Sequence, residues 1–423
     1  MAGEVTLTTT LNKASFPVTS TPQLAYVLIE VQPTAAVADV RMPLNFGFVL
    51  DHSGSMRGEK IEQLREAVKL AIDQMADEDL VSVVVFNDSA DLVVSSRPAA
   101  DRDKLKRKID RIRAGGGTAV SRGMREGLRQ IGQGVSGDRM SRMLLLTDGQ
   151  TFGDERDCVR LAGDAQSQGI AVNALGLGDD WNEDLLDDIA AAGGGDSDFI
   201  DTPDKIVPLF SQTVQRTQST VVHNAEMILR LVSGVVPRQV WQVTPMIANL
   251  GYQPLSERDV QVSLGEIEAQ DGKSVLVELM LPPRPAGRYR IAQAEVTYDV
   301  PAQGVVEEKV RSDILVGFTS DAAQAKQYDP RVMNVAEKVT AFKLQTRALE
   351  EARSGNVAGA TQKLRAAATR LLDLGEQELA EAALQEADNL ETQGAMSSAG
   401  TKKLRYETRK LTQKLVDENA SDQ

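Results

Sequence analysis

Between residues 41 and 221, short apolar runs alternate with segments whose apolar residues recur every three or four positions. Runs at residues 44–50, 81–86 and 143–147 predict strands buried on both faces. Further strands are predicted at residues 92–94 (an antiparallel edge strand), 170–175 and 198–200. Helices are predicted at residues 61–75, 101–113, 120–132, 155–167, 183–191 and 203–217. This alternation is typical of a doubly wound α/β domain with a mostly parallel sheet.

On both sides of this region the apolar residues recur at every second position, which predicts half-buried strands. The predicted strands lie at residues 5–11, 23–31, 225–232, 258–264, 274–280, 288–298 and 310–316. We expect an antiparallel β-sandwich made of residues 1–40 and 222–320, with the α/β domain of residues 41–221 inserted between its strands.

The last part of the chain, residues 321–423, is rich in Ala, Leu, Glu and Lys. Apolar residues at helical spacing predict helices at residues 332–349, 357–374 and 376–390, and a basic last helix at 401–415. Gly375 is expected to end the second of these as a C-cap. The whole chain is therefore predicted to be multidomain, with α/β, β-sandwich and helical-bundle parts.

Composition narrows the classes of function. A chain of 423 residues is long enough for two or three domains. Its net charge of −14 argues against nucleic-acid binding, which relies on clustered Lys and Arg. Cys158 is a single cysteine and favours a reducing compartment. We see no signal peptide and no run of 18 apolar residues, so we expect a cytoplasmic protein without a membrane span.

Five oxygen-bearing side chains follow predicted strands or a glycine-rich loop. Asp51, Ser53 and Ser55 come directly after one strand, Thr118 follows three glycines, and Asp148 ends another strand. Ligands in open α/β sheets bind beyond the carboxyl ends of the strands, so these side chains are expected to share one crevice. Hydroxyls and carboxylates are hard donors, which select Mg²⁺, Mn²⁺ or Ca²⁺ over zinc or copper, and we expect Mg²⁺.

The order Asp-x-Ser-x-Ser, loop threonine and strand-end aspartate resembles the metal-ion-dependent adhesion site of the von Willebrand factor A (VWA) family. All five family positions are filled here, by Asp51, Ser53, Ser55, Thr118 and Asp148. The resemblance implies a Rossmann-like fold in which the two serines coordinate the metal directly. It implies that the threonine binds directly or through water, and that the aspartates act largely through water and hydrogen bonds.

The same resemblance implies a function. In this family a cation held mainly by neutral hydroxyls stays electrophilic and takes a carboxylate from a partner protein as its sixth ligand. We therefore expect a non-enzymatic interaction module, in a scaffold or adaptor, that binds an exposed Asp or Glu of its partner. Gly54, Met56, Gly117 and Gly149 are expected at the rim of the site. The coat proteins Sec23 and Sec24 combine a similar α/β domain with a β-sandwich and helices.

Simpler interpretations stand beside these. Asp51 to Ser55 alone is compatible with helix capping, and Asp148-Gly149 alone is a common turn. His52 is expected to point away from the site as an ordinary loop side chain, and Cys158 to be buried on its helix. Three other functions remain open: a Mg²⁺-dependent phosphatase, a scaffold whose metal only stabilises the fold, and a non-catalytic component of an ATPase or signalling-kinase assembly. No Walker A loop, H-E-x-x-H, G-x-S-x-G or Cys–His pairing supports an enzyme.

Overall fold

The computed structural model describes residues 3–38, 40–151 and 153–413, and these residues form two compact units. One unit is residues 41–219, and the other combines residues 1–40 with residues 220–423. Each unit has a hydrophobic core of its own. The two are described separately below.

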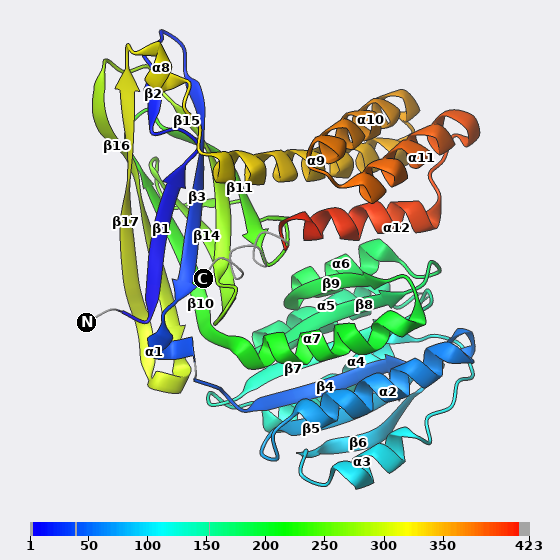
Figure 1. The fold of residues 1–423 in the computed structure, drawn as a ribbon. Helices are drawn as coiled ribbons and strands as arrows, with labels where there is room; N and C mark the ends of the chain where they lie inside the picture. Colours follow the sequence, from blue (N-terminus) through cyan, green and yellow to red (C-terminus); the bar gives the residue numbers. More distant parts are fainter. Residues whose placement is uncertain (1–2, 39, 152, 414–423) are drawn as a thin grey trace. The chain divides into compact units, whose positions relative to one another are not determined.

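The unit of residues 41–219 is built on one six-stranded sheet with the order β6-β5-β4-β7-β8-β9 (Figure 1). Its strands are β4 (Leu44–Asp51), β5 (Leu80–Phe86), β6 (Ala90–Pro98), β7 (Met140–Thr147), β8 (Ile170–Leu177) and β9 (Gly194–Ile200). Only β6 runs antiparallel to its neighbour. Every residue of β4 and β7 is buried, as expected for mostly apolar strands covered on both faces. The predicted, mostly parallel sheet is confirmed.

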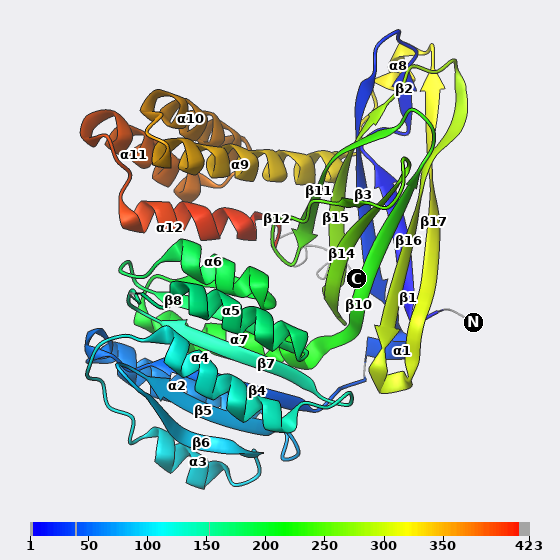
Figure 2. The ribbon, with the colours of Figure 1, turned by 180° about the vertical axis from the view of Figure 1, so that it is seen from behind.

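Helices cover both faces of this sheet. One face carries α2 (Glu59–Gln74), α3 (Arg102–Ile109) and α7 (Ile206–Ser219), which are seen in front of the sheet in Figure 1. The other carries α4 (Val120–Ile131), α5 (Glu155–Ser167) and α6 (Glu183–Ala192), which are in front in Figure 2. Three 3₁₀ turns, η1 (Gly54–Met56), η2 (Gly132–Gly134) and η3 (Pro203–Lys205), complete the unit. Phe48 of β4 stacks on Phe210 of α7 at 5.9 Å between ring centroids.

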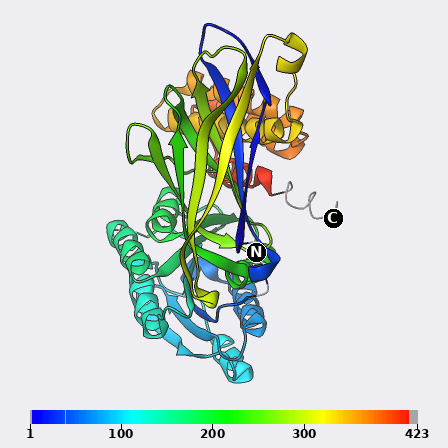
Figure 3. The ribbon, with the colours of Figure 1, turned by 90° about the vertical axis from the view of Figure 1, so that its left-hand side faces the viewer.

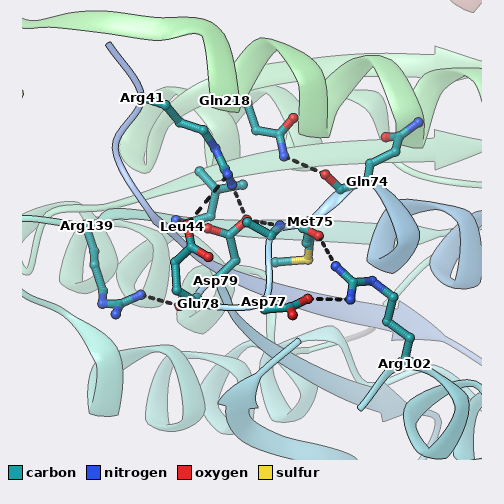
Figure 4. Close-up of polar contacts among 11 residues, drawn as sticks. Arg41, Leu44, Gln74, Met75, Asp77, Glu78, Asp79, Arg102, Arg139 and Gln218 are labelled. Atoms are coloured by element: carbon teal, nitrogen blue, oxygen red, sulfur yellow. Dashed lines mark hydrogen bonds and ion pairs between the residues drawn. The ribbon is translucent and has the colours of Figure 1, made fainter. Parts of the chain in front are cut away.

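A buried carboxylate fixes the starts of β4 and β5 (Figure 4). Asp79 is fully buried, and its two oxygens accept hydrogen bonds from the backbone N–H groups of Leu44 and Ala76, both at 2.8 Å. Arg41 donates to the same carboxylate. These bonds hold the first residue of β4 beside the turn that leads into β5, at the end of the sheet opposite Asp51.

The other unit contains two β-sheets that enclose one core (Figure 3). The first sheet has the order β1 (Val5–Leu11), β3 (Gln23–Pro33), β15 (Lys273–Leu281), β11 (Val236–Thr244) and β12 (Ala248–Asn249). The second has the order β13 (Gln253–Pro254), β14 (Asp259–Glu268), β10 (Thr220–Leu231), β16 (Gly287–Val300), β17 (Val305–Thr319) and β2 (Ser15–Pro17). All neighbours are antiparallel except β17 and β2.

Helices pack on the outer face of the first sheet. They are α9 (Pro330–Arg353), α10 (Val357–Asp373), α11 (Gln377–Gln393) and α12 (Ser398–Glu407), followed by the 3₁₀ turn η5 (Thr408–Thr412). Leu28, Leu276 and Trp241 of the sheet join the core of these helices, and Trp241 meets Phe342 of α9 edge-on. Gly375 takes the left-handed conformation, with φ of 79°, directly after α10, as a C-cap requires.

Several predicted boundaries need correction. Strand β11 was not predicted because Pro237 interrupts its apolar run, and the two-residue strands β12 and β13 carry no periodic signal. Only strands were predicted in the first forty residues, but these residues also contain α1 (Ala35–Ala38). Shorter helices also occur at α8 (Ala322–Ala325) and η4 (Pro301–Gln303).

Two predicted helices differ from those observed. The helix expected through residue 113 ends at Ile109, where the chain turns toward the glycine-rich loop. The basic last helix begins at Ser398, because the Ser397 hydroxyl caps it by accepting from the Gly400 N–H at 2.9 Å. Residues 414 and 415, predicted as its end, lie outside the described residues.

Candidate metal centre

Asp51 is the last residue of β4, the strand that lies between β5 and β7. After β4, the chain adds β5 and β6 on one side of it and then β7, β8 and β9 on the other. Asp51 therefore lies at the point where the strand order reverses. Its side chain is fully buried. One carboxylate oxygen accepts from the backbone N–H of Ser53 at 2.7 Å, and the other accepts from the Thr147 hydroxyl at 2.7 Å. Asp51 thus fixes the loop that follows β4 and joins it to the end of β7.

The two serines form a chain of hydrogen bonds to the second aspartate. The Ser53 and Ser55 hydroxyl oxygens are 3.0 Å apart, and the Ser55 hydroxyl donates to Asp148 Oδ1 at 2.6 Å. Ser53 and Asp148 are buried, whereas Ser55 is exposed. The group is therefore buried at Ser53 and Asp148 and reaches solvent at Ser55.

Thr118 completes the group from the glycine-rich loop. Its Oγ1 lies 3.4 Å from the point where a Cβ on Gly149 would be, and the Ser55 Oγ lies 3.9 Å from that point. The hydroxyls of Ser55 and Thr118 thus lie beside the same backbone segment after β7. A glycine at 149 leaves that space open.

Backbone hydrogen bonds hold the two loops together. The Gly54 N–H donates to the Gly116 carbonyl at 2.9 Å, and the Gly115 N–H donates to the His52 carbonyl at 2.7 Å. Asp88, from the turn between β5 and β6, accepts from the Gly117 N–H at 2.9 Å. The glycine-rich loop is thereby positioned by the ends of both β4 and β5.

Lys60 supplies the one positive charge in direct contact with these carboxylates among the described residues. Its Nζ lies 2.5 Å from Asp148 Oδ2, on the oxygen that Ser55 does not use. Asp51 has no such partner. Burial raises the pKa of Asp51, the nearby charge of Asp148 adds to the rise, and the hydrogen bonds from Thr147 and Ser53 oppose it.

These observations fit a divalent cation held by oxygen donors. Two buried carboxylates face one ammonium group, and buried charges in proteins are normally paired or bound to metal. Among the described residues, His, Cys, Asp and Glu form no group of three suited to a metal ion, so a cation here depends on the hydroxyls. Such a donor set favours Mg²⁺, Mn²⁺ or Ca²⁺.

The structure brings Asp51, Ser53, Ser55, Thr118 and Asp148 to the carboxyl edge of the sheet, as the sequence predicts for strand ends. Among the predicted rim residues, Gly54, Gly117 and Gly149 belong to the loops of the site.

The placement of Met56 at the rim was wrong. Its side chain is fully buried in the core beneath α2, because η1 turns it inward. His52 does point away from the five side chains, but it is buried, and its Nδ1 is 2.8 Å from the Arg113 carbonyl.

Sequence reasoning missed four contributors: Lys60, Asp88, Thr147 and Asp154. The Asp154 carboxylate accepts from the Ser121 N–H at 2.9 Å and so caps α4, whose own N-cap residue, Ala119, has no side-chain acceptor. All of these contacts join residues far apart in the chain. Of the four, Thr147 could most easily have been predicted, because it stands directly before Asp148 at the same strand end.

Comparison with known proteins assigns two parts of the chain. Residues 45–207 match the model of the von Willebrand factor type A domain, and residues 330–414 match that of the Sll0103-like C-terminal alpha-helical domain. These matches agree with the family resemblance that the Asp-x-Ser-x-Ser motif indicates, and with the helical nature of the last part of the chain.

Two curated relatives cover different shares of the chain. The chain is 33% identical over 280 residues to the uncharacterized protein sll0103 of Synechocystis sp.. The aligned region covers 65% of this chain and 66% of that protein. It is 22% identical over 187 residues to the uncharacterized protein YfbK of Escherichia coli, covering 43% of this chain and 32% of that protein. The chain thus spans less than two thirds of the length of each.

Solved structures share the fold over nearly the whole chain. A von Willebrand factor type A protein from Catenulispora acidiphila has a TM-score of 0.73 at 18% identity, covering 96% of both chains. The ArnB paralog VWA2 from Sulfolobus acidocaldarius has a TM-score of 0.55 at 13% identity, covering 98% of both. Human Sec24c has a TM-score of 0.51 at 14% identity, over 90% of this chain and 59% of that chain. The last likeness agrees with the fold analogy to the Sec23 and Sec24 coat proteins.

Proposed function

We propose that this chain, whose residues 45–207 are a von Willebrand factor type A domain, binds a protein partner through a divalent cation and has no enzymatic activity of its own. VWA domains are protein-interaction modules and are often metal-dependent. The observation that carries the proposal is the group of two buried carboxylates and three hydroxyls at one edge of the sheet. That group includes an exposed member, Ser55, through which a partner can reach it.

The five residues of the site would have two different roles. Ser53, Ser55 and Thr118 would hold the cation with uncharged oxygens, while Asp51 and Asp148 would orient the serines by the hydrogen bonds described above. A cation bound this way would accept an Asp or Glu carboxylate of the partner as a further ligand. Mg²⁺ is the proposed metal, with Mn²⁺ or Ca²⁺ as substitutes.

The surroundings of the site support a non-enzymatic role. His52 has its Nδ1 bound to a backbone carbonyl, and Lys60 is paired with Asp148, so neither is placed as a general base beside a free nucleophile. Cys158 is fully buried on α5, and burial together with nearby carboxylates raises the pKa of its thiol. A thiol of this kind is a poor nucleophile.

We further propose that the protein serves as a scaffold or adaptor in a cytoplasmic complex. Support comes from the free, buried thiol of Cys158, which suits a reducing compartment. None of the helices in the described part of the chain has the length and apolarity to cross a membrane.

Metal binding is tested by titrating Mg²⁺ and Mn²⁺ into the metal-free protein in a calorimeter. We expect one site per chain in the wild type and a loss of affinity of at least about tenfold in Thr118→Ala, which removes a half-buried hydroxyl with little effect on packing. Ser167→Ala on α5 is the matched control, because among the described residues its hydroxyl bonds only to the Asp164 carbonyl. Equal affinities in all three proteins would exclude this site.

Partner recognition is tested by capture from the source cell's lysate with wild type and Thr118→Ala, each in Mg²⁺ and in EDTA. A partner retained only by wild type with Mg²⁺, and lost when its own acidic residues are replaced, supports recognition through the metal. If EDTA lowers the melting temperature but leaves the captured proteins unchanged, the metal serves the fold alone. Phosphatase activity that requires Mg²⁺ and Asp51 would contradict the non-enzymatic assignment.

A further inference from the structure

A cavity of about 490 Å³ lies in the second unit, between the outer face of the first sheet and helix α9. Its floor comes from β3, β15 and β11, and its wall from residues of α9 spaced three or four apart. Those wall residues are Thr340, Lys343, Leu344 and Arg347. Cavities between roughly 300 and 1,000 Å³ are the usual size of small-molecule sites.

The floor combines polar side chains with the apolar Leu24. Strand register places Tyr26 opposite Glu278, and Glu278 opposite Gln239, so the three form a row across β3, β15 and β11. The same face holds Leu276 and Trp241, which belong to the core beneath the helices. Tyr26 also packs against this core, so the polar row lies directly beside the helix–sheet contact.

A β-bulge brings Arg238 into the lining of the cavity. The pairing of β11 with β15 shifts register between Pro237 and Gln239, which leaves Arg238 as the extra residue. Arg238 and Gln239 both line the cavity, although adjacent residues of a regular strand point to opposite faces. Bulges redirect side chains in this way and are common beside binding sites.

The cavity carries an excess of positive charge. The only carboxylate in its lining, Glu278, is buried and already paired, with Lys343 Nζ 2.7 Å from its Oε1. Lys343 is also held over the Trp241 ring, 5.4 Å from the centroid. Arg238 and Arg347 remain, both exposed, and neither has a hydrogen bond or ion pair with any residue that the structure describes. Two unpaired guanidinium groups thus flank the cavity in a chain whose net charge is −14.

We propose that this cavity binds a small organic molecule with two anionic groups, held by Arg238 from the sheet and Arg347 from α9. Guanidinium groups bind carboxylate and phosphate with paired hydrogen bonds, so both a dicarboxylate and a phosphate ester fit the chemistry. Tyr26 offers a hydroxyl, and Leu24 and Leu344 offer apolar contact to the rest of the ligand. The cavity is open to solvent on one side, and its volume suits a small molecule.

Such a ligand would bridge two elements that are far apart in the sequence. Arg238 lies on β11 and Arg347 near the end of α9, so the bound molecule would tie the helix to the sheet. Binding to the folded chain raises its stability in proportion to ligand occupancy. The site is separate from the proposed metal centre, and its ligand is expected to bind without added Mg²⁺.

The experiment uses the full chain with pyrophosphate as the phosphate probe and citrate as the carboxylate probe, at constant ionic strength. Calorimetry measures the affinity in wild type, Arg238→Gln and Arg347→Gln. Arg288→Gln is the matched control, since Arg288 is an exposed arginine on β16 with no partner among the described residues.

We expect at least one probe to bind wild type and Arg288→Gln equally, and to bind each of the other two variants at least about tenfold more weakly. The probe that binds identifies the phosphate or the carboxylate class. Melting temperatures without probe should match in all four proteins, because both arginines are exposed and unpaired. If neither probe binds wild type, or if Arg238→Gln and Arg347→Gln bind like wild type, the proposal is overturned.

Discussion

At the scale of single residues, Lys60 and Asp148 set the charge of the proposed metal centre. The carboxylate is buried and the ammonium group lies 2.5 Å from it, so Lys60 provides one positive charge at the place where a dication is proposed to bind. A cation that binds here is repelled by this charge unless the Lys60 ammonium group moves away. Lys60 is therefore expected to weaken metal binding while stabilising the metal-free protein.

Replacing Lys60 with Met tests this expectation. In EDTA the melting temperature should fall, because Asp148 is left buried without its partner, at a cost of about 3 kcal/mol. In calorimetry Mg²⁺ should bind at least about tenfold more tightly, because the competing charge is gone. Lys69→Met on the same helix is the control, since the carboxylates it pairs with, Glu66 and Asp110, are exposed. Weaker Mg²⁺ binding in Lys60→Met would show that Lys60 supports the metal.

Glu295 provides a second test at this scale, in the β-sandwich. Its side chain is nearly fully buried on β16, between Arg230, at 2.9 Å, and Arg311. Hydrogen bonds from the two arginines, Arg230 first, lower the pKa of Glu295 from 4.5 to about 2. Because the pKa of Glu295 is lower in the folded than in the unfolded protein, its ionised form stabilises the fold at pH values above the unfolded pKa. This stability is lost as the pH falls from about 4.5 toward 2.

The measurement is the urea midpoint of wild type and Glu295→Gln between pH 7 and pH 2. Glu295→Gln should be less stable at neutral pH by about 1–3 kcal/mol, and the difference should shrink as the pH falls through the window from 4.5 to 2. Other carboxylates titrate in both proteins, so only the difference reports on Glu295. A difference that is constant over the whole range would contradict the assigned ion pairs.

At the scale of elements, the sequence predicted what depends on local pattern. The strands and helices of residues 41–219 were predicted because β4, β5 and β7 are mostly apolar and the helices between them are amphipathic. Five of the site residues were predicted because they stand at strand ends or in a glycine-rich loop. They also fill the five positions of the motif that resembles the VWA metal site.

The parts that were missed depend on distant contacts. Nothing near Lys60 in the sequence indicates that it pairs with Asp148, 88 residues away. Strand β11 was not predicted because Pro237 interrupts its pattern. The cavity beside Arg238 depends on a bulge that forms only when β11 pairs with β15. Met56 looked like a rim residue because it follows Ser55, but the η1 turn directs it into the core.

The packing of α4 on the sheet depends on glycines at the contact. A Cβ on Gly127 would lie 2.3 Å from Val49 Cγ2 of β4, a distance that no relaxed structure allows. Gly163 on α5 is its counterpart, because a Cβ there would meet nothing within 4 Å. The two positions separate the packing effect of a methyl group from its effect on helix propensity.

Gly127→Ala and Gly163→Ala should therefore change stability in opposite directions. We expect Gly127→Ala to destabilise by about 1–3 kcal/mol through overpacking, and Gly163→Ala to stabilise by about 0.5–1 kcal/mol through helix propensity. Both are measured by urea denaturation at neutral pH. Stabilisation by Gly127→Ala would show that α4 lies farther from β4 than described.

At the scale of the whole molecule, the chain divides into two units with separate cores, joined near residues 40 and 220. The metal centre belongs to one unit and the arginine-lined cavity to the other. Domains with their own cores commonly unfold as independent units. We therefore expect two thermal transitions in calorimetry, each tied to one core.

Two matched substitutions assign the transitions. Leu144 on β7 and Leu279 on β15 are fully buried, each in the core of its own unit. Leu144→Ala should lower only one transition and Leu279→Ala only the other, each at a cost of about 2–5 kcal/mol. Because the metal centre lies in the unit of Leu144, Mg²⁺ should raise the transition that Leu144→Ala lowers and leave the other unchanged. A single transition that both substitutions lower and Mg²⁺ raises would mean that the two units unfold together.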